Sequence, residues 1–583
     1  MKLARISRKL GVLLGIMMST LTLGATALAQ GEVPNFTPVT EAVLKNPAPG
    51  DWLHWRRTYD AFGYSPLDQI NKNNVKNLQV AWAWTMIDGR QETTPLVYDG
   101  IMYLHNFNDK VQALNAATGD LIWEYTREVP DGVGSAGLSR SIAIHGDNIY
   151  FLSADTAIVA LKAKTGELVW EHYVAPYKFG YKYTNGPLIA NGVIVAGMTG
   201  CGGAQPGGCF ITGHDVATGK ELWRVHTIAR DGTPQAKTWN GIPQDKRFGG
   251  SAWMIGSYDP QLNLVYHGTG QPYPWIAEMN GLLPKSSDPS LSNEALYTNT
   301  TLAINPTTGE VVWYHQWLPT DTLDLDYAYE QMLIDMDIGG TMRKLLVVVG
   351  KLGIIEAVDR TTGEWLWAKE TVYQNVVASI DATTGKKTMN PEAIPHIGQT
   401  TINCPADPGA RSWASTAYNP VNQTLYLPMQ EFCSDTTPEP LEAGEIYTGR
   451  GRATFKRRLV PGKNNAGRVD AVRLSDRQEV WSHSMRAANG GSAALATGGG
   501  LVFTGNLNRE IMAFDDANGT VLWKRRLNNV PNGYPVSYMA NGKQFIAVPV
   551  GFGSGPSKAF SVLTPEIINV PGGAMLWVFS LGD

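Results

Sequence analysis

The sequence predicts an all-β fold, an eight-bladed β-propeller with Trp-docking repeats and long inserted loops over one face. Three observations predict it. One phrase of about eleven residues recurs along the chain, each copy centres on a polar turn, and successive copies are mostly about 40–50 residues apart. Because a repeated unit of short strands must bury its apolar face against a neighbour, the recurrence indicates a set of similar sheets packed side by side.

Each copy of the phrase is typical of an antiparallel hairpin. Residues 113–123 read Ala-Leu-Asn-Ala-Ala-Thr-Gly-Asp-Leu-Ile-Trp, and residues 160–170 read Ala-Leu-Lys-Ala-Lys-Thr-Gly-Glu-Leu-Val-Trp. A short apolar strand leads into a Thr-Gly or Asn-Gly turn, where Gly accepts positive φ, and a second apolar run ends in Trp. The flat indole suits packing between adjacent sheets. Further copies end at Trp223, Trp313, Trp367 and Trp523, a degenerate copy ends at Trp481, and an N-terminal half-copy ends at Trp84.

These eight endings predict one propeller domain over residues 30–583, although the length alone would allow several domains. The alternative is a sandwich of unrelated hairpins, which the repeated turn-plus-Trp phrase disfavours. Two intervals exceed one blade, Trp223 to Trp313 and Trp367 to Trp481, and they predict insertions at about 230–300 and 370–470. Their Trp and Cys residues indicate ordered segments that cover the face where the axial funnel opens.

The N-terminus has the pattern of a secretory leader over residues 1–29. Basic residues stand at positions 2, 5, 8 and 9, residues 11–23 are apolar, and residues 27–29 read Ala-Leu-Ala. The apolar run is short for a membrane span, and no later segment has the required length, so we expect no span. The pattern predicts a protein exported to a bacterial periplasm.

The four cysteines and the charge narrow the functional classes. A periplasmic protein forms disulfides, and the simplest pairing joins Cys201 to Cys209 and Cys404 to Cys433, although four cysteines allow three connectivities. The sequence contains no Cys-x-x-Cys-His, so we expect no c-type haem on this chain. The formal net charge of −4 gives no support for a nucleic-acid partner.

Several segments between the repeats carry a more specific pattern. Residues 64–71 read Tyr-Ser-Pro-Leu-Asp-Gln-Ile-Asn, residues 91–96 read Gln-Glu-Thr-Thr-Pro-Leu, residues 249–253 read Gly-Gly-Ser-Ala-Trp, and residues 321–326 read Asp-Thr-Leu-Asp-Leu-Asp. With the Trp-ended repeats, they resemble the quinoprotein alcohol dehydrogenases, which bind pyrroloquinoline quinone (PQQ) in an eight-bladed propeller. The resemblance covers nearly the whole chain after the leader, but the repeats alone also occur in non-catalytic propellers.

The resemblance implies which residues contact PQQ. Glu92 matches the Glu that contacts the quinone, and Arg140 matches an Arg that binds a PQQ carboxylate, for which a buried guanidinium is a natural bidentate partner. Trp253 matches the Trp that forms the floor under the planar quinone, and Lys351 matches a cation near the reactive carbonyl oxygens. The remaining cofactor-binding positions implied are Thr184, Thr199, Trp413, Asn489 and Gly490.

The same resemblance implies a catalytic base and a metal site. Asp324 matches the general base that takes the proton of the alcohol hydroxyl. The implied metal ligands are Gln271, where relatives usually have Asn, together with Asp324 and Asp326. Asp326 stands where lanthanide-using relatives add a carboxylate, so the implied ion is Ca²⁺ or, alternatively, a lanthanide.

Three departures from the family pattern concern the pocket. Residues 134–137 read Gly-Ser-Ala-Gly where studied members have adjacent cysteines, and residues 199–209 contain no acid where a Glu metal ligand is expected. Lys351 replaces the Arg of methanol-oxidising relatives. We interpret the chain as a divergent member with a more open pocket, better suited to a bulky primary or secondary alcohol than to methanol, with a small primary alcohol and a polyol as alternatives.

The sequence therefore predicts a periplasmic, PQQ- and metal-dependent alcohol dehydrogenase that passes electrons to an external acceptor such as cytochrome c. A homodimer is a candidate assembly. Two other hypotheses compete with it. A non-catalytic envelope scaffold predicts scattered loss of the quinone-binding residues, which is not what the chain has. A propeller hydrolase or lyase predicts an acid–base or metal cluster away from the quinone positions, and the sequence contains no such cluster.

Overall fold

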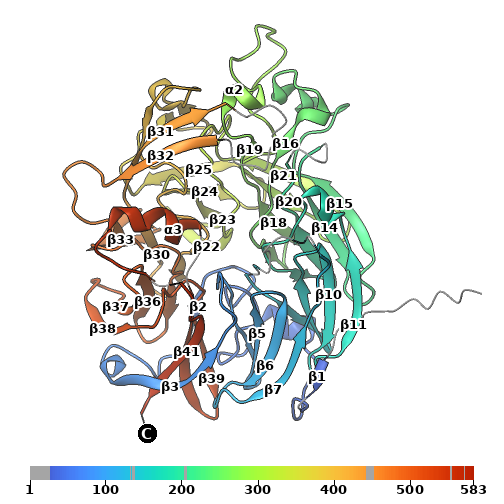
Figure 1. Ribbon diagram of the computed structural model, residues 1–583, viewed down its shortest axis with the longest axis vertical. Helices are drawn as coiled ribbons and strands as arrows, with labels where there is room; N and C mark the ends of the chain where they lie inside the picture. The colour runs from blue at the N-terminus through green and yellow to red at the C-terminus, as the bar shows by residue number, and fades with distance from the viewer. Residues whose placement is uncertain are drawn as a thin grey trace, which may run out of the picture.

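The computed structural model of the protein describes residues 27–29, 31–131, 133, 138, 140–202, 207–440, 452–551, 555–569 and 571–582. Residues 134–137 and most of the predicted leader therefore lie outside the described residues. The described chain is built mainly of antiparallel sheets. Figure 1 shows these sheets following one another in chain order around a common centre, which confirms the predicted β-propeller architecture.

The first half of the ring consists of sheets whose strands follow one another along the chain. The first sheet contains β4 (Leu96–Tyr98), β5 (Ile101–Asn106), β6 (Lys110–Asn115) and β7 (Leu121–Thr126), with β1 (Ala27–Ala29) beside β7. The next contain β8 (Ala143–His145), β9 (Asn148–Leu152), β10 (Ala157–Lys162) and β11 (Leu168–Tyr173), then β12 (Leu188–Ala190), β13 (Val193–Gly197), β14 (Phe210–Asp215) and β15 (Glu221–His226), then β17 (Ser257–Asp259), β18 (Leu264–Gly268), β20 (Thr300–Ile304) and β21 (Val311–Gln316).

The second half repeats the arrangement. Its sheets contain β22 (Met332–Ile338), β23 (Thr341–Val349), β24 (Ile354–Asp359) and β25 (Trp365–Glu370), then β29 (Ala417–Asn419), β30 (Thr424–Gln430), β33 (Gly467–Arg473) and β34 (Gln478–Met485). They continue with β35 (Leu495–Thr497), β36 (Leu501–Asn506), β37 (Glu510–Asp515) and β38 (Val521–Arg526), with β2 (Tyr64–Ser65) parallel to β35. The final sheet contains β39 (Val536–Ala540), β40 (Lys543–Val550), β41 (Met575–Leu581) and β3 (Leu78–Thr85), so strands from the two ends of the ring share one sheet.

Each full copy of the recurring phrase forms an antiparallel hairpin, as predicted. In β6–β7, Ala113 pairs with Trp123 and the register shifts directly after Ala113. Every later copy places a small residue opposite its Trp and shifts register at the same point, as at Ala160–Trp170 and Gly213–Trp223. A small partner is required because the indole covers the position that a larger side chain would occupy: at Gly213 an added Cβ would lie 2.1 Å from the Trp223 ring.

The Trp of one sheet packs onto the turn glycine of the next sheet. Trp123 Nε1 donates to Ala163 O at 3.0 Å, and a Cβ added to Gly166 would lie 2.5 Å from Trp123 Cε3. The same contact joins Trp82 to Gly119, Trp170 to Gly219, Trp223 to Gly309, Trp313 to Gly363 and Trp481 to Gly519. The predicted role of Trp as a wedge between sheets is confirmed.

Two details of the repeat differ from the prediction. In the half-copy, Trp82 rather than Trp84 makes the wedge contact: Trp82 Nε1 donates to Ala116 O at 3.2 Å, whereas Trp84 Nε1 donates to the Gln112 side chain. Both indoles belong to β3, and a register shift between Val80 and Trp82 aligns the earlier one with the next sheet. In the degenerate copy, Arg477 takes the place of the turn glycine at φ +60°, and its guanidinium lies over the ring of Trp367.

Each predicted insertion divides into two parts. In the first insertion, η3 (Pro234–Trp239), η4 (Gln244–Lys246) and β16 (Phe248–Gly249) precede β17. The second part of this insertion, with β19 (Pro272–Tyr273) and α2 (Ala277–Asn280), lies between β18 and β20. In the second insertion, β26 (Val377–Ile380), β27 (Lys387–Met389), η5 (Pro391–Ala393) and β28 (Thr401–Asn403) precede β29. Its second part, with β31 (Cys433–Glu439) and β32 (Arg452–Arg458), lies between β30 and β33. β28, β31 and β32 form one sheet, and disulfides join Cys404 to Cys433 and Cys201 to Cys209, the simplest of the pairings considered.

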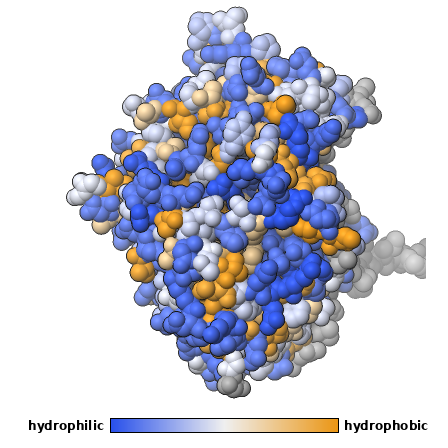
Figure 2. All heavy atoms as spheres, turned by 90° about the vertical axis from the view of Figure 1, so that its left-hand side faces the viewer, coloured by the Kyte–Doolittle hydropathy of each residue, from blue (hydrophilic) through white to orange (hydrophobic). Residues whose placement is uncertain are grey.

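Helices are few among the described residues. They are α1 (Glu41–Lys45), α3 (Gly555–Phe560), η1 (Val75–Asn77), η2 (Tyr177–Phe179), η6 (Ser561–Leu563) and those already named. None of the helices in the described ranges has the length and apolarity needed to cross a bilayer. Figure 2 shows hydrophilic side chains predominating on one face of the molecule, with apolar side chains in separate patches.

Candidate functional site

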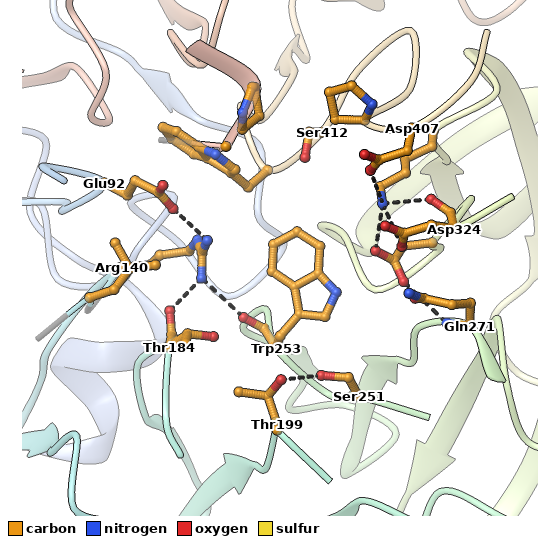
Figure 3. A pocket seen from close by; sticks show the side chains of 18 of the residues that line it. Glu92, Arg140, Thr184, Thr199, Ser251, Trp253, Gln271, Asp324, Asp407 and Ser412 are labelled. Atoms are coloured by element: carbon orange, nitrogen blue, oxygen red, sulfur yellow. Dashed lines mark hydrogen bonds and ion pairs between the residues drawn. The ribbon is translucent and has the colours of Figure 1, made fainter. Parts of the chain in front are cut away.

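A cavity of about 270 Å³ lies near the starts of β4, β8, β12, β17, β22 and β29. Its lining residues stand a few positions before those strands: Glu92 before β4, Arg140 before β8, Thr184 before β12, Trp253 before β17, Asp324 before β22 and Trp413 before β29. Because equivalent loops of a propeller meet at one end of its axis, residues far apart in sequence converge there. Figure 3 shows Trp253 in the middle of this cavity, with Glu92 and Arg140 on one side and Asp324 and Asp407 on the other.

One end of the cavity is a buried ion pair. Arg140 Nη2 contacts Glu92 Oε2, Arg140 Nη1 contacts the backbone oxygen of Thr184, and the side chains of Arg140 and Glu92 are 4% and 2% exposed. Burial raises the pKa of Glu92, although the charge of Arg140 opposes that shift. Arg140 Nε is buried without a hydrogen-bond partner among the described residues, so this end retains a donor for an anionic group.

Two indoles flank the same guanidinium. The Arg140 guanidinium carbon lies 4.9 Å from the centre of the Trp253 ring and 5.8 Å from that of Trp413. Tyr534 Oη fixes Trp413 by donating to its backbone oxygen at 2.8 Å, while the Trp413 indole N–H is buried without a partner in the described chain. These rings offer flat surfaces to a planar ligand.

The other end of the cavity is a cluster of charged side chains. Lys351 Nζ lies 2.9 Å from Asp324 Oδ1 and 2.9 Å from Asp326 Oδ2, and all three side chains are nearly buried. Burial alone would lower the pKa of Lys351, but the two carboxylates raise it well above its usual value. The ammonium is therefore charged.

The loop that carries these acids is held by Asp321. Its Oδ1 accepts from Leu323 N at 2.8 Å, and its Oδ2 accepts from Leu325 N at 2.7 Å and from Asn299 Nδ2 at 3.0 Å. Burial raises the pKa of Asp321. Asp324 has φ +59°, a left-handed conformation that is uncommon for residues other than glycine and costs about 1–3 kcal/mol. The surrounding bonds hold Asp324 in this conformation, with its carboxylate at the cavity wall.

The wall between the two ends comes from the first insertion and the neighbouring sheet. Thr199 Oγ1 is hydrogen-bonded to Ser251 Oγ, and Gln271 N donates to Asp326 Oδ1 at 3.1 Å. Tyr273 lies beside them, and burial together with the charges of Asp326 and Asp324 raises the pKa of its phenol. Gln271 thus lies beside Asp326 in the cavity wall, and it makes this contact through its backbone N.

Ten of the twelve site residues implied by the resemblance line this cavity. Asn489 and Gly490 lie outside its lining. Asn489 Nδ2 donates to Gly505 O at 2.8 Å, and the backbone oxygen of Gly490 accepts from Ser557 Oγ at 2.8 Å, which places this loop behind the wall.

The structure also adds residues to the cavity that the sequence analysis did not select. They are Arg90, Leu138, Lys182, Gly200, Ser251, Tyr273, Asp407, Pro408, Ser412, Gly555 and Pro556. Two features of the sequence could have indicated some of these residues. Asp407 and Ser412 lie in the long interval between Trp367 and Trp481, and Tyr273 lies only two residues after Gln271.

The sequence profile described as "PQQ: Glucose/ethanol/alcohol dehydrogenase, beta-propeller domain" matches residues 52–379 and 463–546. The chain belongs to the PQQ-dependent alcohol dehydrogenase family. It is 33% identical over 549 residues to the "Alcohol dehydrogenase (quinone), dehydrogenase subunit" of Gluconobacter oxydans, covering 87% of this chain and 71% of that protein. It is 31% identical to the "Quinohemoprotein alcohol dehydrogenase ADH-IIG" of Pseudomonas putida, covering 91% of this chain and 77% of that protein.

Solved structures agree with this membership. Quinohemoprotein alcohol dehydrogenase ADHIIG from Pseudomonas putida HK5 superposes with a TM-score of 0.80 at 29% identity, covering 94% of this chain and 83% of that one. A "Europium-containing methanol dehydrogenase" superposes with a TM-score of 0.82 at 25% identity, covering 93% and 99%. As a member of the family, the chain is a PQQ-dependent alcohol dehydrogenase.

The residues present fit both groups. The Nε of Arg140 and the indole N–H of Trp413, which have no partner among the residues that the structure describes, suit the acceptor oxygens of a planar polycarboxylate. At the other end the donor set of Asp324, Asp326 and Gln271 consists of oxygens, as hard cations require. Within the described ranges, however, no group of three His, Cys, Asp or Glu side chains is arranged as a metal site.

Proposed function

We propose that the chain oxidises a bulky primary or secondary alcohol in the periplasm and passes the electrons to a separate acceptor such as cytochrome c. The single observation that carries the proposal is the two-ended cavity, with the Arg140–Glu92 pair at one end, the Lys351–Asp324–Asp326 cluster at the other and Trp253 between them. A separate acceptor is supported by the four cysteines, all of which are in disulfides and leave none for haem attachment. A bulky substrate is supported by the lack of adjacent cysteines at residues 134–137.

In this proposal Arg140 and Glu92 orient the cofactor, and Trp253 and Trp413 supply flat surfaces against its plane. PQQ, when bound, supplies a carbonyl that accepts hydride from the alcohol carbon. Asp324 takes the proton of the alcohol hydroxyl on its carboxylate, and Lys351 supplies a cation near the reactive carbonyl oxygens of the cofactor. Gln271, Asp324 and Asp326 hold the metal ion, which is Ca²⁺ or a lanthanide. Thr184 and Thr199 contribute to the wall, and Asn489 and Gly490 support it from behind.

We further infer that the sheets of the ring are the eight blades of one domain over residues 30–583 that follows a cleaved leader of residues 1–29. The shared sheet of β3 and β41 supports a single closed unit. A homodimer remains the candidate assembly.

The test is reconstitution. The purified chain is loaded with PQQ and either Ca²⁺ or La³⁺, and reduction of an artificial electron acceptor is followed over a panel of small primary, bulky primary and secondary alcohols. We expect turnover that favours bulky substrates, and a loss of about 10²–10⁴-fold in kcat for Asp324→Asn with PQQ binding retained. Turnover confined to methanol would contradict the substrate class, and full activity of Asp324→Asn would remove Asp324 as the base.

A further inference from the structure

The loop that follows Cys404 packs directly against Lys351. Ala410 N donates to Lys351 O at 2.7 Å. At Gly409, which has φ +95°, an added Cβ would lie 2.5 Å from the Cβ of Lys351. The stem of the lysine therefore occupies the space that a side chain at position 409 would need. The loop of the second insertion and Lys351 form one packed unit.

The same loop brings a third carboxylate to the lysine. Asp407 Oδ1 lies 3.9 Å from Lys351 Nζ, and the Asp407 side chain is only 9% exposed. Figure 3 shows Asp407 and Asp324 approaching the cluster from different directions. In the described part of the chain, the carboxylates within 4 Å of this ammonium are those of Asp324, Asp326 and Asp407.

Arg457 of β32 fixes the position of Asp407. Its Nε and Nη2 donate to the Asp407 backbone oxygen at 3.2 and 3.0 Å, and its Nη2 lies 3.5 Å from Asp407 Oδ2. The Cys404–Cys433 disulfide joins the start of the loop to β31 of the same sheet. The sheet formed by β28, β31 and β32 thus determines where the third carboxylate lies.

A cation bound by Asp324 and Asp326 would compete with Lys351 for the same oxygens, and it would repel the ammonium. A buried ammonium that loses two carboxylates needs another anion, because an unpaired buried charge is strongly unfavourable. Asp407 is within reach and is attached to a different segment from the metal ligands. We propose that Asp407 is a positioning residue that holds Lys351 in the cavity when the metal ion takes over the carboxylates of Asp324 and Asp326. This rests on the proposed function.

Calorimetric titration of the chain with CaCl₂ and with LaCl₃, without PQQ or substrate, tests the proposal. In Asp407→Asn, Lys351 stays on the two metal-binding carboxylates, so we expect cation affinity to fall by about 10–100-fold, the usual effect of removing a residue that supports a metal ligand. The decisive comparison uses Lys351→Met. Once the competing ammonium is removed, Asp407→Asn should have no further effect on cation affinity.

Asp435→Asn is the matched control. Asp435 lies in the same sheet and pairs with Arg458 at 3.0 Å, one residue from Arg457, but both side chains are partly exposed. We expect Asp435→Asn and Arg458→Lys to leave cation affinity unchanged, and Arg457→Lys to weaken it. Urea unfolding of each variant establishes that it is folded.

Two outcomes would overturn the positioning role. One is unchanged cation affinity in Asp407→Asn. The other is an equal loss from Asp407→Asn in the Lys351→Met background, which would make Asp407 a metal ligand instead. Both leave the proposed function standing, because the parent chain still binds cation and PQQ. A parent chain that binds neither would reject the proposed function and this inference together.

Discussion

The indole of Trp313 occupies the space that a side chain at Gly363 in the next sheet would need. Trp313 Nε1 donates to Arg360 O at 3.1 Å, and a Cβ built on Gly363 would lie 2.6 Å from Trp313 Cε3. The sheet that contains Trp313 therefore offers an indole on one side and, at Gly309, an empty turn position that receives Trp223 on the other. The contact between sheets depends on the missing side chain as much as on the ring.

Gly363→Ala tests this contact. The residue has φ +77°, so the added methyl group strains the backbone as well as meeting the indole. Gly340 is a matched control, since it has φ +83° and nothing lies within 4 Å of its added Cβ. We expect Gly340→Ala to lower the free energy of unfolding by about 1–2 kcal/mol and Gly363→Ala by a further 1–3 kcal/mol, measured by urea titration. Equal losses would show that the Trp–Gly contact contributes no packing energy.

We expect Lys387 to be essential to the stability of the protein, whereas we expect the adjacent Lys386 to contribute little. Lys387 Nζ lies 2.5 Å from Glu356 Oε2 and donates to Trp317 O at 2.7 Å, with both charged side chains fully buried. Lys387→Met leaves Glu356 uncompensated and should cost about 3–5 kcal/mol. Lys386 pairs with Glu294 but is 64% exposed, so Lys386→Met should change the free energy of unfolding by less than about 1 kcal/mol. Similar urea midpoints for the two variants would refute the buried pair.

Acidification should destabilise the protein through buried histidines. Burial lowers the pKa of His54 from 6.5 to about 4, although its Nε2 lies 3.0 Å from Leu44 O. Between pH 6.5 and 4 the unfolded chain binds a proton that the folded chain does not, so the free energy of unfolding falls as the pH falls. The full contribution, about 3 kcal/mol for His54, is present above pH 6.5. Burial also lowers the pKa of His214 and His267 to about 4, with the same sign.

His54→Gln should flatten this dependence. The measurement is the urea midpoint of the parent and the variant at several pH values from 4.5 to about 7.5. The variant is expected to lose less stability on acidification than the parent. Parallel curves would show that His54 does not carry the pH dependence.

Arg140→Lys should weaken cofactor binding without unfolding the chain. Lysine keeps the charge near Glu92, but it lacks the planar fork and the Nε donor, and it stacks less well between Trp253 and Trp413. We expect PQQ to dissociate about 10–100-fold more readily, as measured by quenching of tryptophan fluorescence. Arg127→Lys, at a buried ion pair with Asp155, is the control for loss of a buried arginine. Equal PQQ affinity in parent and Arg140→Lys would remove Arg140 from the site.

The local parts of this fold could be predicted from the sequence. The Thr-Gly turn and the terminal Trp of each copy act within one hairpin and its neighbour, so the pattern predicted both the hairpins and the wedge. The choice of Trp82 over Trp84 could not be predicted, because both indoles fit the alternation and the register shift in β3 decides between them. The two-part insertions also depend on contacts between distant segments.

The residues of the candidate site also fall into those that could be predicted from the sequence and those that could not. Arg140, Trp253 and Asp324 occupy segments that resemble the family, and the structure brings them to one cavity. Asn489 and Gly490 belong to a similar segment but lie behind the wall, because Asn489 bonds to the backbone of β36. Asp407 has no family counterpart in the sequence analysis, and only the folded loop brings it to Lys351. The roles of these residues remain predictions for the experiments above.

The pairing of β3 with β41 has a consequence for synthesis of the chain. β3 lies near the beginning of the ring, yet its partner is the last strand, so Ala83 pairs with Trp577 and Thr85 with Met575. While a ribosome is still translating the segment between them, β3 has no native neighbour on this side, and the nascent chain carries an unsatisfied strand edge for nearly its whole length. The ring therefore closes only after residues 575–581 have been synthesised, and a chaperone that shields residues 78–85 until then would be expected to raise the yield of folded protein.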